Sequence, residues 1–203
     1  MIPVTLPNVI FYCLVFSAIY YLGVSIHKRK FVRIEIPKLL FYISIFSVFG
    51  VAGEIVVNNL FLWLTGSPLW IYQLYPAHGG DVSYFFIGIW GALGFYKYIN
   101  DSAIHRPTSD ILKPAVIMGT EAIILELTYN GLFLVLFSQY IFYYFPENLG
   151  RLSHLSCLEV IPFYFAVGFC LSLLIKKQNV IGYGKHLVIT LPFLWMVTTA
   201  LIL

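Results

Sequence analysis

Charged residues are scarce in this chain. Only 10% of its 203 residues are Asp, Glu, Lys or Arg, and 60% are hydrophobic, whereas about a quarter of the residues are charged in a typical soluble domain. This balance excludes an ordinary soluble globular domain. The chain also lacks a basic patch and any nucleic-acid recognition motif, so we expect no nucleic-acid partner.

Cysteine is scarce too, and the common catalytic and metal-binding motifs are absent. The three cysteines, Cys13, Cys157 and Cys170, form no CxxC pair and no Cys/His spacing typical of a metal site. Neither an HEXXH zinc signature nor a GxSxG nucleophile elbow is present. Two histidines with two or three carboxylates would suffice to hold one metal ion, but no spacing requires it. We therefore predict no cofactor and no metal site.

Long hydrophobic runs dominate what is present. A helix needs about 20 apolar residues to cross the hydrocarbon core of a membrane. Charged residues and prolines divide the chain into six such runs, which predicts an all-α integral membrane protein with six transmembrane helices. The first run has no basic residues before it and no cleavage site, so we expect it to remain as a span. The runs are Leu6–Ile26, Leu39–Thr65, Val82–Tyr98, Pro114–Phe137, Leu158–Ile175 and Leu187–Leu203.

The basic residues predict the orientation of these spans. Eleven of the twelve Lys and Arg residues lie at or after the ends of the first, third and fifth runs or before the next ones, and only Arg151 lies on the other side. Cytoplasmic loops carry the excess of Lys and Arg. Both termini are therefore predicted to be non-cytoplasmic in a multi-pass protein of a plasma, inner or endomembrane.

One stretch of the sequence occurs twice. Between residues 54–64 and 126–136, six of eleven positions are identical, including a Glu and an Asn inside apolar runs. Both hairpins of spans would begin and end in the cytoplasm. This predicts a parallel repeat about an axis along the membrane normal, in contrast to the inverted repeats of many transporters. We expect one polytopic membrane domain, 1–203, with repeat units at about 39–98 and 114–177.

The two predicted outer loops share a pattern of clustered aromatic residues, a proline and then a histidine. Trp and Tyr gather at membrane interfaces, which favours an interfacial belt; a lid facing a substrate is the alternative. The loop residues singled out for a site are Trp70, Tyr72, His78, Asp81, Tyr143 and His154.

Carboxylates inside apolar spans need an explanation, because no Lys or Arg lies deep in any span. Such groups are protonated, hydrogen-bonded or paired with a cation, and they are candidates for function. Glu54 is followed four residues later by Asn58, on the same helix face. Glu126 and Asn130 repeat this spacing. The four residues predict a site on the repeat axis, or else a hydrogen-bonded clamp between helices.

The pattern leads to a functional hypothesis. We expect a membrane-embedded enzyme of the isomerase or cyclase type, acting by acid–base catalysis on a lipid or isoprenoid-type substrate. The predicted catalytic residues are Glu54 and Glu126 as acid and base, with His78 and His154 as proton relays. The predicted substrate-binding residues are Asn58, Asn130, Trp70, Tyr72, Tyr143 and Asp81.

Two alternative functions stay open at this point. Carboxylates without resident counter-ions also suit a small proton- or cation-coupled transporter or channel. A short membrane protein with few loops is also a candidate accessory subunit, with a membrane-protein partner or a second copy of itself. The expected partner in the enzyme hypothesis is a membrane lipid or another apolar molecule.

Overall fold

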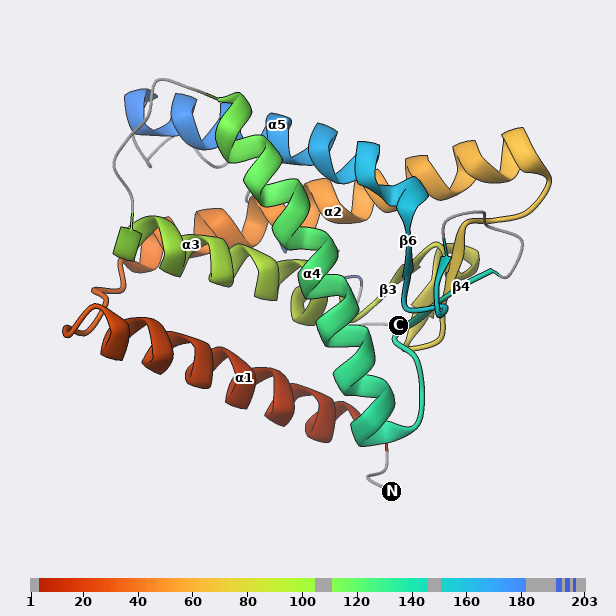
Figure 1. Cartoon of the computed structure of the whole chain (residues 1–203), viewed down its shortest axis with the longest axis horizontal. Coiled ribbons are helices and arrows are strands. Elements are labelled where there is room, and N and C mark those ends of the chain that lie inside the picture. The colour runs from red at the N-terminus through yellow and green to blue at the C-terminus, as the bar shows by residue number, and fades with distance from the viewer. Residues whose placement is uncertain are drawn as a thin grey trace. The chain divides into compact units, whose positions relative to one another are not determined.

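The structure is a computed structural model that describes residues 4–104, 111–145 and 151–181, with positions 193–194, 196–197 and 199. It is mainly helical (Figure 1). Four helical segments are long and apolar enough to cross a membrane, which agrees with the predicted class of all-α membrane protein. The helices are α1 (Leu6–His27), α2 (Ile36–Thr65), α3 (Ala92–Ile104), α4 (Leu112–Phe137) and α5 (Ile161–Ile181).

The third predicted span differs from the observed structure at both of its ends. Its first residues form the strand β3 (Val82–Ser83), in which Ser83 Oγ donates a hydrogen bond to the Leu74 carbonyl. A π-helix, η2 (Ile87–Gly91), then leads into α3. Helix α3 ends six residues beyond Tyr98, the predicted end of the span. Lys97 and Asp101, one turn apart on this helix, form an ion pair that stabilises the extension. The sixth predicted span lies outside the described residues except for five positions.

The chain divides into two compact units. The first, here called the site unit, comprises Phe49–Phe85 and the described part of Asp110–Lys176. The second, here called the α1–α3 unit, comprises the described parts of Pro3–Val48, Phe86–Ser109 and Lys177–Leu203. Helix α2 contributes its first part to the α1–α3 unit and its second part to the site unit.

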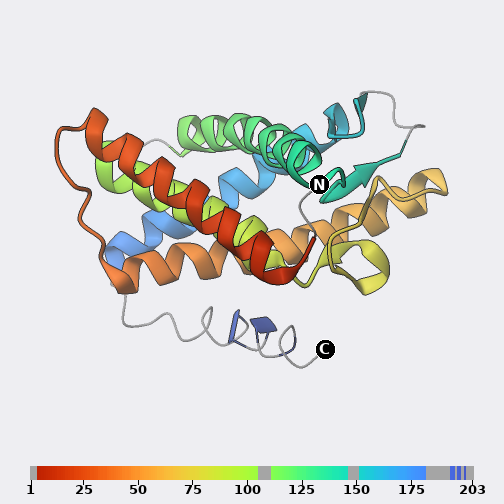
Figure 2. The same ribbon diagram turned by 90° about the horizontal axis from the view of Figure 1, so that it is seen from below.

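In the α1–α3 unit, helices α1 and α3 lie side by side (Figure 2). Helix α3 also lies close against the first part of α2, because a Cβ on Gly94 would be only 2.7 Å from the Tyr42 carbonyl oxygen. The Tyr42 hydroxyl donates to Asp101 at 2.8 Å. Small residues allow helix backbones to approach closely, and Gly94 does so here.

The site unit contains short strands, and all of them except β3 lie in segments that the sequence predicted to be loops. Strand β1 (Trp70–Tyr72) pairs antiparallel with β4 (Phe142–Tyr144). Two small hairpins pair β2 (Pro76–Ala77) with β3, and β5 (Arg151–Leu152) with β6 (Ser156–Cys157). The 3-10 turns η1 (His78–Gly80) and η3 (Leu158–Val160) accompany them. Figure 1 shows these strands gathered beside the second part of α2.

The register of β1 and β4 relates the two loops to each other. Ile71 lies opposite Tyr143, and Trp70 lies opposite Tyr144. Ile71 and Tyr143 are 72 residues apart, which is also the separation of Glu54 and Glu126. The two strands therefore pair antiparallel about residues that correspond in the sequence repeat, as two identical strands do across a twofold axis.

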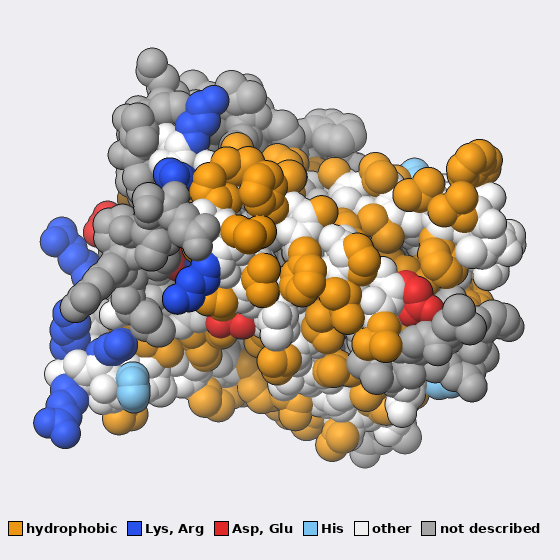
Figure 3. All heavy atoms as spheres, turned by 45° about the horizontal axis from the view of Figure 1, so that its top comes forward, with side chains coloured by type: hydrophobic (Ala, Val, Ile, Leu, Met, Phe, Trp, Pro, Cys, Tyr) orange, Lys and Arg blue, Asp and Glu red, His pale blue; other side chains and the backbone are white. Residues whose placement is uncertain are grey.

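Helix α4 presents apolar side chains outward. Figure 3 shows hydrophobic side chains covering much of the face that it draws. An apolar surface of this kind on a long helix fits contact with lipid tails rather than with water. The exposed apolar side chains of α4 include Val116, Ile117, Ile124, Leu132 and Val135.

Candidate functional site

Asn58, on α2, is buried and holds the start of the loop that follows this helix, here called the first loop. Its Oδ1 accepts hydrogen bonds from the backbone N–H groups of Leu69 at 2.8 Å and Trp70 at 3.2 Å. Its Nδ2 donates to the Trp70 carbonyl at 3.1 Å and to Asp81 Oδ1 at 2.6 Å. One amide side chain therefore fastens the helix to strand β1 and to the following hairpin.

Asn130, on α4, does the same for the second loop. Its Oδ1 accepts from the Ile141 N–H at 2.9 Å, and its Nδ2 donates to the Phe142 carbonyl at 2.9 Å. Nδ2 also donates to the Leu155 carbonyl at 3.2 Å. The partners lie 11 and 12 residues after the asparagine in both loops. These amides thus bind the protein's own backbone.

Glu54 lies one turn before Asn58 and is also buried, with 7% of its surface exposed. It accepts a hydrogen bond from the hydroxyl of Tyr72, on β1. Burial is the main cause that raises the pKa of Tyr72 well above its ordinary value of 10.0, and the nearby carboxyl of Glu54 raises it further. The phenol therefore keeps its proton and acts as a hydrogen-bond donor to the carboxyl.

Glu126 occupies the matching position on α4 and is 8% exposed. Its Oε2 accepts from the hydroxyl of Tyr164, on α5. The side chains of Tyr144 and Ser156 also lie within hydrogen-bonding reach of this carboxyl. Burial is the main cause that raises the pKa of Tyr144 well above its ordinary value of 10.0, and the Glu126 carboxyl raises it further. A second carboxyl thus lies among phenolic hydroxyl groups.

A small cavity lies beside Glu54, Tyr72, Tyr144 and Tyr164. It has room for about one water molecule. Glu54 forms part of its wall, and so does Tyr164, which binds Glu126. The carboxyls and the tyrosines therefore belong to one cluster within the site unit, here called the Glu–Tyr cluster: Glu54, Tyr72, Glu126, Tyr144 and Tyr164. The full lining is Glu54, Trp70, Tyr72, Phe142, Tyr144, Val160, Phe163 and Tyr164.

The sequence analysis missed two tyrosines of this cluster. Tyr144 had a usable signal, because it lies 18 residues after Glu126, as Tyr72 does after Glu54. Tyr164 had none, since the position 72 residues before it is Ala92. Ser156 was missed as well, because nothing in the sequence of a loop shows which residue will be buried beside a carboxyl.

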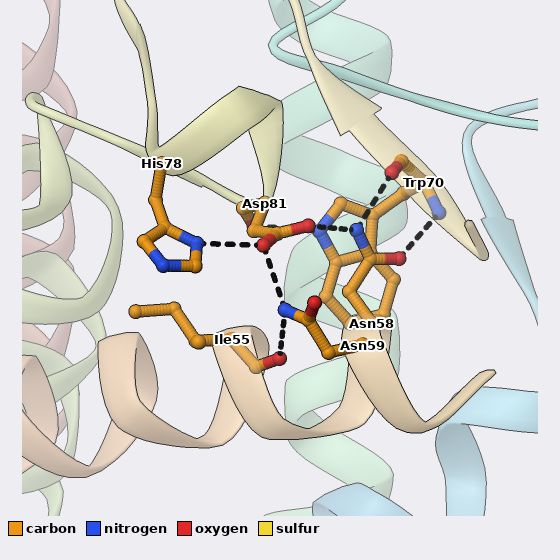
Figure 4. Close-up of polar contacts among 6 residues, drawn as sticks. All are labelled: Ile55, Asn58, Asn59, Trp70, His78 and Asp81. Atoms are coloured by element: carbon orange, nitrogen blue, oxygen red, sulfur yellow. Dashed lines mark hydrogen bonds and ion pairs between the residues drawn. The ribbon is translucent and has the colours of Figure 1, made fainter. Parts of the chain in front are cut away.

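The predicted residue His78 is bound to Asp81 rather than to a glutamate. Its Nδ1 lies 2.7 Å from Asp81 Oδ2. Asn59 Nδ2 donates to the same oxygen at 2.8 Å, and the Trp70 indole N–H donates to the Asp81 backbone carbonyl at 3.0 Å. Figure 4 shows Asp81 at the centre of these contacts. Asp81 thus links the first hairpin to α2.

The predicted residue His154 has different partners. Its Nδ1 lies 2.8 Å from the Tyr144 carbonyl oxygen. Its ring stacks on Tyr143 with the centroids 4.4 Å apart and the planes at 12°. His154 and Tyr143 thus form a pair in the second loop, which touches the Glu–Tyr cluster through the backbone of Tyr144.

Among the described residues, no group of three or more His, Cys, Asp and Glu side chains converges as a metal site would require. Comparison of the chain with protein-family models, with curated proteins and with solved structures gives no match.

Proposed function

We propose that the chain is a six-span membrane protein with both termini on the non-cytoplasmic side and a parallel repeat of two hairpin units, at about 39–98 and 114–177. The matching hydrogen bonds of Asn58 and Asn130 support this arrangement. The pairing of Ile71 with Tyr143 supports a twofold axis along the membrane normal. In this proposal the Glu–Tyr cluster lies on that axis, in the outer half of the membrane.

The proposed activity is acid–base catalysis inside the membrane. One observation carries it: two buried carboxyls accept hydrogen bonds from the hydroxyls of Tyr72 and Tyr164, and these two tyrosines line one cavity together with Glu54. Glu126 has no ion-pair partner among the described residues, and an unpaired buried carboxyl favours its protonated form. A protonated carboxylic acid beside a second carboxyl group supplies a proton donor and a proton acceptor in one site.

The corresponding reaction is the isomerisation or cyclisation of an apolar substrate with a carbon–carbon double bond. One carboxyl donates its proton to a carbon of the double bond, and the adjacent carbon becomes cationic. The other carboxylate then removes a proton from a neighbouring carbon, and the electron pair of that C–H bond forms the new double bond. Atoms and charge balance without a co-reactant, and aromatic faces such as Trp70 and Phe142 stabilise the cation.

The remaining predicted site residues have supporting roles in this proposal. Asn58 and Asn130 hold the two strands over the cluster, and His78 and His154 exchange protons with the outer solution. Trp70, Tyr72, Tyr143 and Asp81 shape the substrate side. Because the cavity holds about one water molecule, a lipid or isoprenoid enters only when the lining side chains move apart.

Deuterium uptake tests this proposal without a known substrate. Purified protein is reconstituted with an extract of its native lipids in D2O, and the lipids are analysed by mass spectrometry. Wild-type protein is expected to place deuterium on carbon in one lipid species, and the Glu54→Gln, Glu126→Gln double variant is not. Glu121→Gln, on the same helix as Glu126, is the matched control and should retain uptake. Equal uptake by the wild type and the double variant would refute the proposal.

A second candidate, a proton or small-cation transporter, is favoured by the size of the cavity, which fits a water molecule or a bare cation better than a lipid. Proteoliposomes with an internal pH indicator distinguish the two functions. Proton flux that is lost in the double variant, without deuterium uptake by any lipid, would establish the transporter in place of the enzyme.

A further inference from the structure

A second polar site lies at the surface of the site unit, apart from the buried cluster. It consists of His78, Asp81 and Asn59 and is here called the His–Asp site. The His78 side chain is 56% exposed, whereas that of Asp81 is 17% exposed. The two carboxylate oxygens of Asp81 accept from the amides of Asn58 and Asn59 and contact His78 Nδ1. The aspartate is therefore fixed, and the imidazole that it holds faces outward (Figure 4).

The second loop shows that the fold can hold such a loop without the polar residues of the His–Asp site. The Asn130 amide is satisfied by the backbone carbonyl of Leu155, at the position where Asn58 uses the side chain of Asp81. Gly131 stands where the sequence repeat has Asn59. Among the described residues of the second loop, the same set of asparagine hydrogen bonds, here called the asparagine clasp, thus forms without a carboxylate, a second amide or a histidine bound to a side chain. The three polar residues of the first loop therefore call for an explanation besides hairpin closure.

The geometry determines what the imidazole offers to a ligand. A carboxylate only accepts hydrogen bonds, so the ring nitrogen that faces Asp81 carries the proton. In the neutral ring the other nitrogen, Nε2, is then an acceptor. His78 adopts a positive φ of 51°, which costs free energy for a residue with a side chain. Asp81 and the turn of η1 maintain this position and leave Nε2 pointing away from the carboxylate (Figure 4).

The surroundings of the site are apolar. The side chain of Ile55 lies beneath the imidazole in Figure 4. Further along the same face of α2, Leu62 is 43% exposed and Trp63 is 79% exposed. These residues belong to a helix long and apolar enough to cross a membrane. A hydrogen-bond acceptor beside a lipid-facing helix surface suits a molecule with a polar head and an apolar chain.

From these observations we propose that Nε2 of His78 binds the hydroxyl headgroup of an amphipathic lipid whose chain lies along the exposed apolar face of α2. This inference deepens the proposed enzyme function and rests on it, since it adds a polar, hydroxyl-bearing end to the apolar substrate. Asp81 acts as a positioning residue that sets the tautomer and orientation of the ring.

Nuclear magnetic resonance on protein in phosphatidylcholine nanodiscs tests this inference, because phosphatidylcholine carries no hydroxyl group of its own. The probes are dodecanol, dodecyl methyl ether and propanol. Dodecanol is expected to shift the ¹⁵N resonance of His78 Nε2 saturably. The ether cannot donate a hydrogen bond and should leave the resonance unchanged. Propanol lacks the long chain and should bind far more weakly. His154, in the same sample, is the internal reference and should not shift.

Two variants sharpen the test. His78→Gln leaves Asp81 and its amide partners in place and should abolish saturable binding of ¹³C-labelled dodecanol. Asp81→Asn should weaken binding by about tenfold, because the ring loses its charged orienting partner. Equal binding of alcohol and ether, or wild-type binding by His78→Gln, would overturn the proposal, and equal binding of propanol would reject a lipid as the source of the hydroxyl. The Glu54→Gln, Glu126→Gln variant should still bind dodecanol, so this result is independent of deuterium uptake.

Discussion

At the scale of single residues, the Glu–Tyr cluster owes its properties to burial. A carboxyl in water loses its proton readily, but transfer of the charged form to an apolar site is expensive. Glu54 and Glu126 each accept a hydrogen bond from a tyrosine hydroxyl. Burying a neutral phenol as the donor costs far less desolvation free energy than burying a cation would. This arrangement allows a buried carboxyl to hold its proton beside a neutral phenol.

The protonation of these carboxyls is directly measurable. A protonated carboxylic acid has an infrared C=O stretching band that a carboxylate lacks. We expect such a band in the wild-type protein at neutral pH, and we expect it to shrink in the Glu54→Gln, Glu126→Gln double variant, which lacks the protonated member of the pair. Glu121→Gln serves as the control. Unchanged bands in the double variant would show that both carboxyls are ionised.

Because of Tyr72 and Tyr144, we expect the folded protein to lose stability at alkaline pH. Their folded-state pKa values are raised well above 10.0 by burial and by the neighbouring glutamates. Above about pH 10 the unfolded state therefore loses phenolic protons that the folded state retains, and the free energy of unfolding falls as pH rises. This contribution is fully present below pH 10. Thermal unfolding in detergent between pH 8 and 11 measures it.

The control for this pH dependence is the loss of each phenol in turn. Tyr72→Phe and Tyr144→Phe should each flatten the alkaline fall in unfolding temperature, although each variant is less stable at pH 8 because a buried hydrogen-bonding group loses its partner. An alkaline fall that is the same in both variants and in the wild type would assign it to other groups.

The asparagine clasps predict matched losses of stability. Asn58→Ala and Asn130→Ala each leave buried backbone groups without partners, and we expect each to lower the free energy of unfolding by about 1–3 kcal/mol. Asn59→Ala, an exposed neighbour that loses only its contact with Asp81 and the carbonyl of Ile55, should cost less. Denaturation in mixed micelles compares them. A cost for Asn59→Ala equal to that of Asn58→Ala would contradict the clasp.

At the scale of elements, helices and loops differed in how well the sequence predicted them. Hydrophobic runs predicted α1, α2 and α4 to within three residues at each end. The strands β1 and β4 were not predicted, because three residues have no measurable period and their pairing depends on a partner 72 residues away. The Glu/Asn spacing identified four residues, but it gave no sign that the asparagines bind loop backbone.

Helices α4 and α5 are in such close contact that adding one methyl group at Gly168 should destabilise the fold. A Cβ on Gly168 would be 2.7 Å from the Ala115 backbone oxygen, and backbone atoms cannot yield as a side chain can. Gly168→Ala should therefore lower the free energy of unfolding by about 1–3 kcal/mol. Gly23→Ala, on α1, meets nothing within 4 Å and should be neutral or stabilise by up to about 1 kcal/mol. Equal thermal stability of the two variants would contradict the predicted contact.

At the scale of the whole molecule, composition alone predicts the class, because 60% hydrophobic residues in long runs cannot form a soluble domain. The predicted orientation rests on a different property, the distribution of Lys and Arg along the sequence. The proposed function depends on orientation: with the cluster in the outer half of the membrane, protons and lipid headgroups reach the His–Asp site from the non-cytoplasmic side.

Cysteine labelling in intact cells tests this orientation. In a variant whose three native cysteines are replaced, Gln73→Cys places an exposed thiol in the first outer loop, and Lys30→Cys places one after α1. The positive-inside rule predicts that a membrane-impermeant maleimide labels Gln73→Cys from outside the cell but labels Lys30→Cys only after permeabilisation. The reverse pattern would move the Glu–Tyr cluster and the His–Asp site to the cytoplasmic half of the membrane, where a cytoplasmic rather than an external proton source would have to supply the carboxyls.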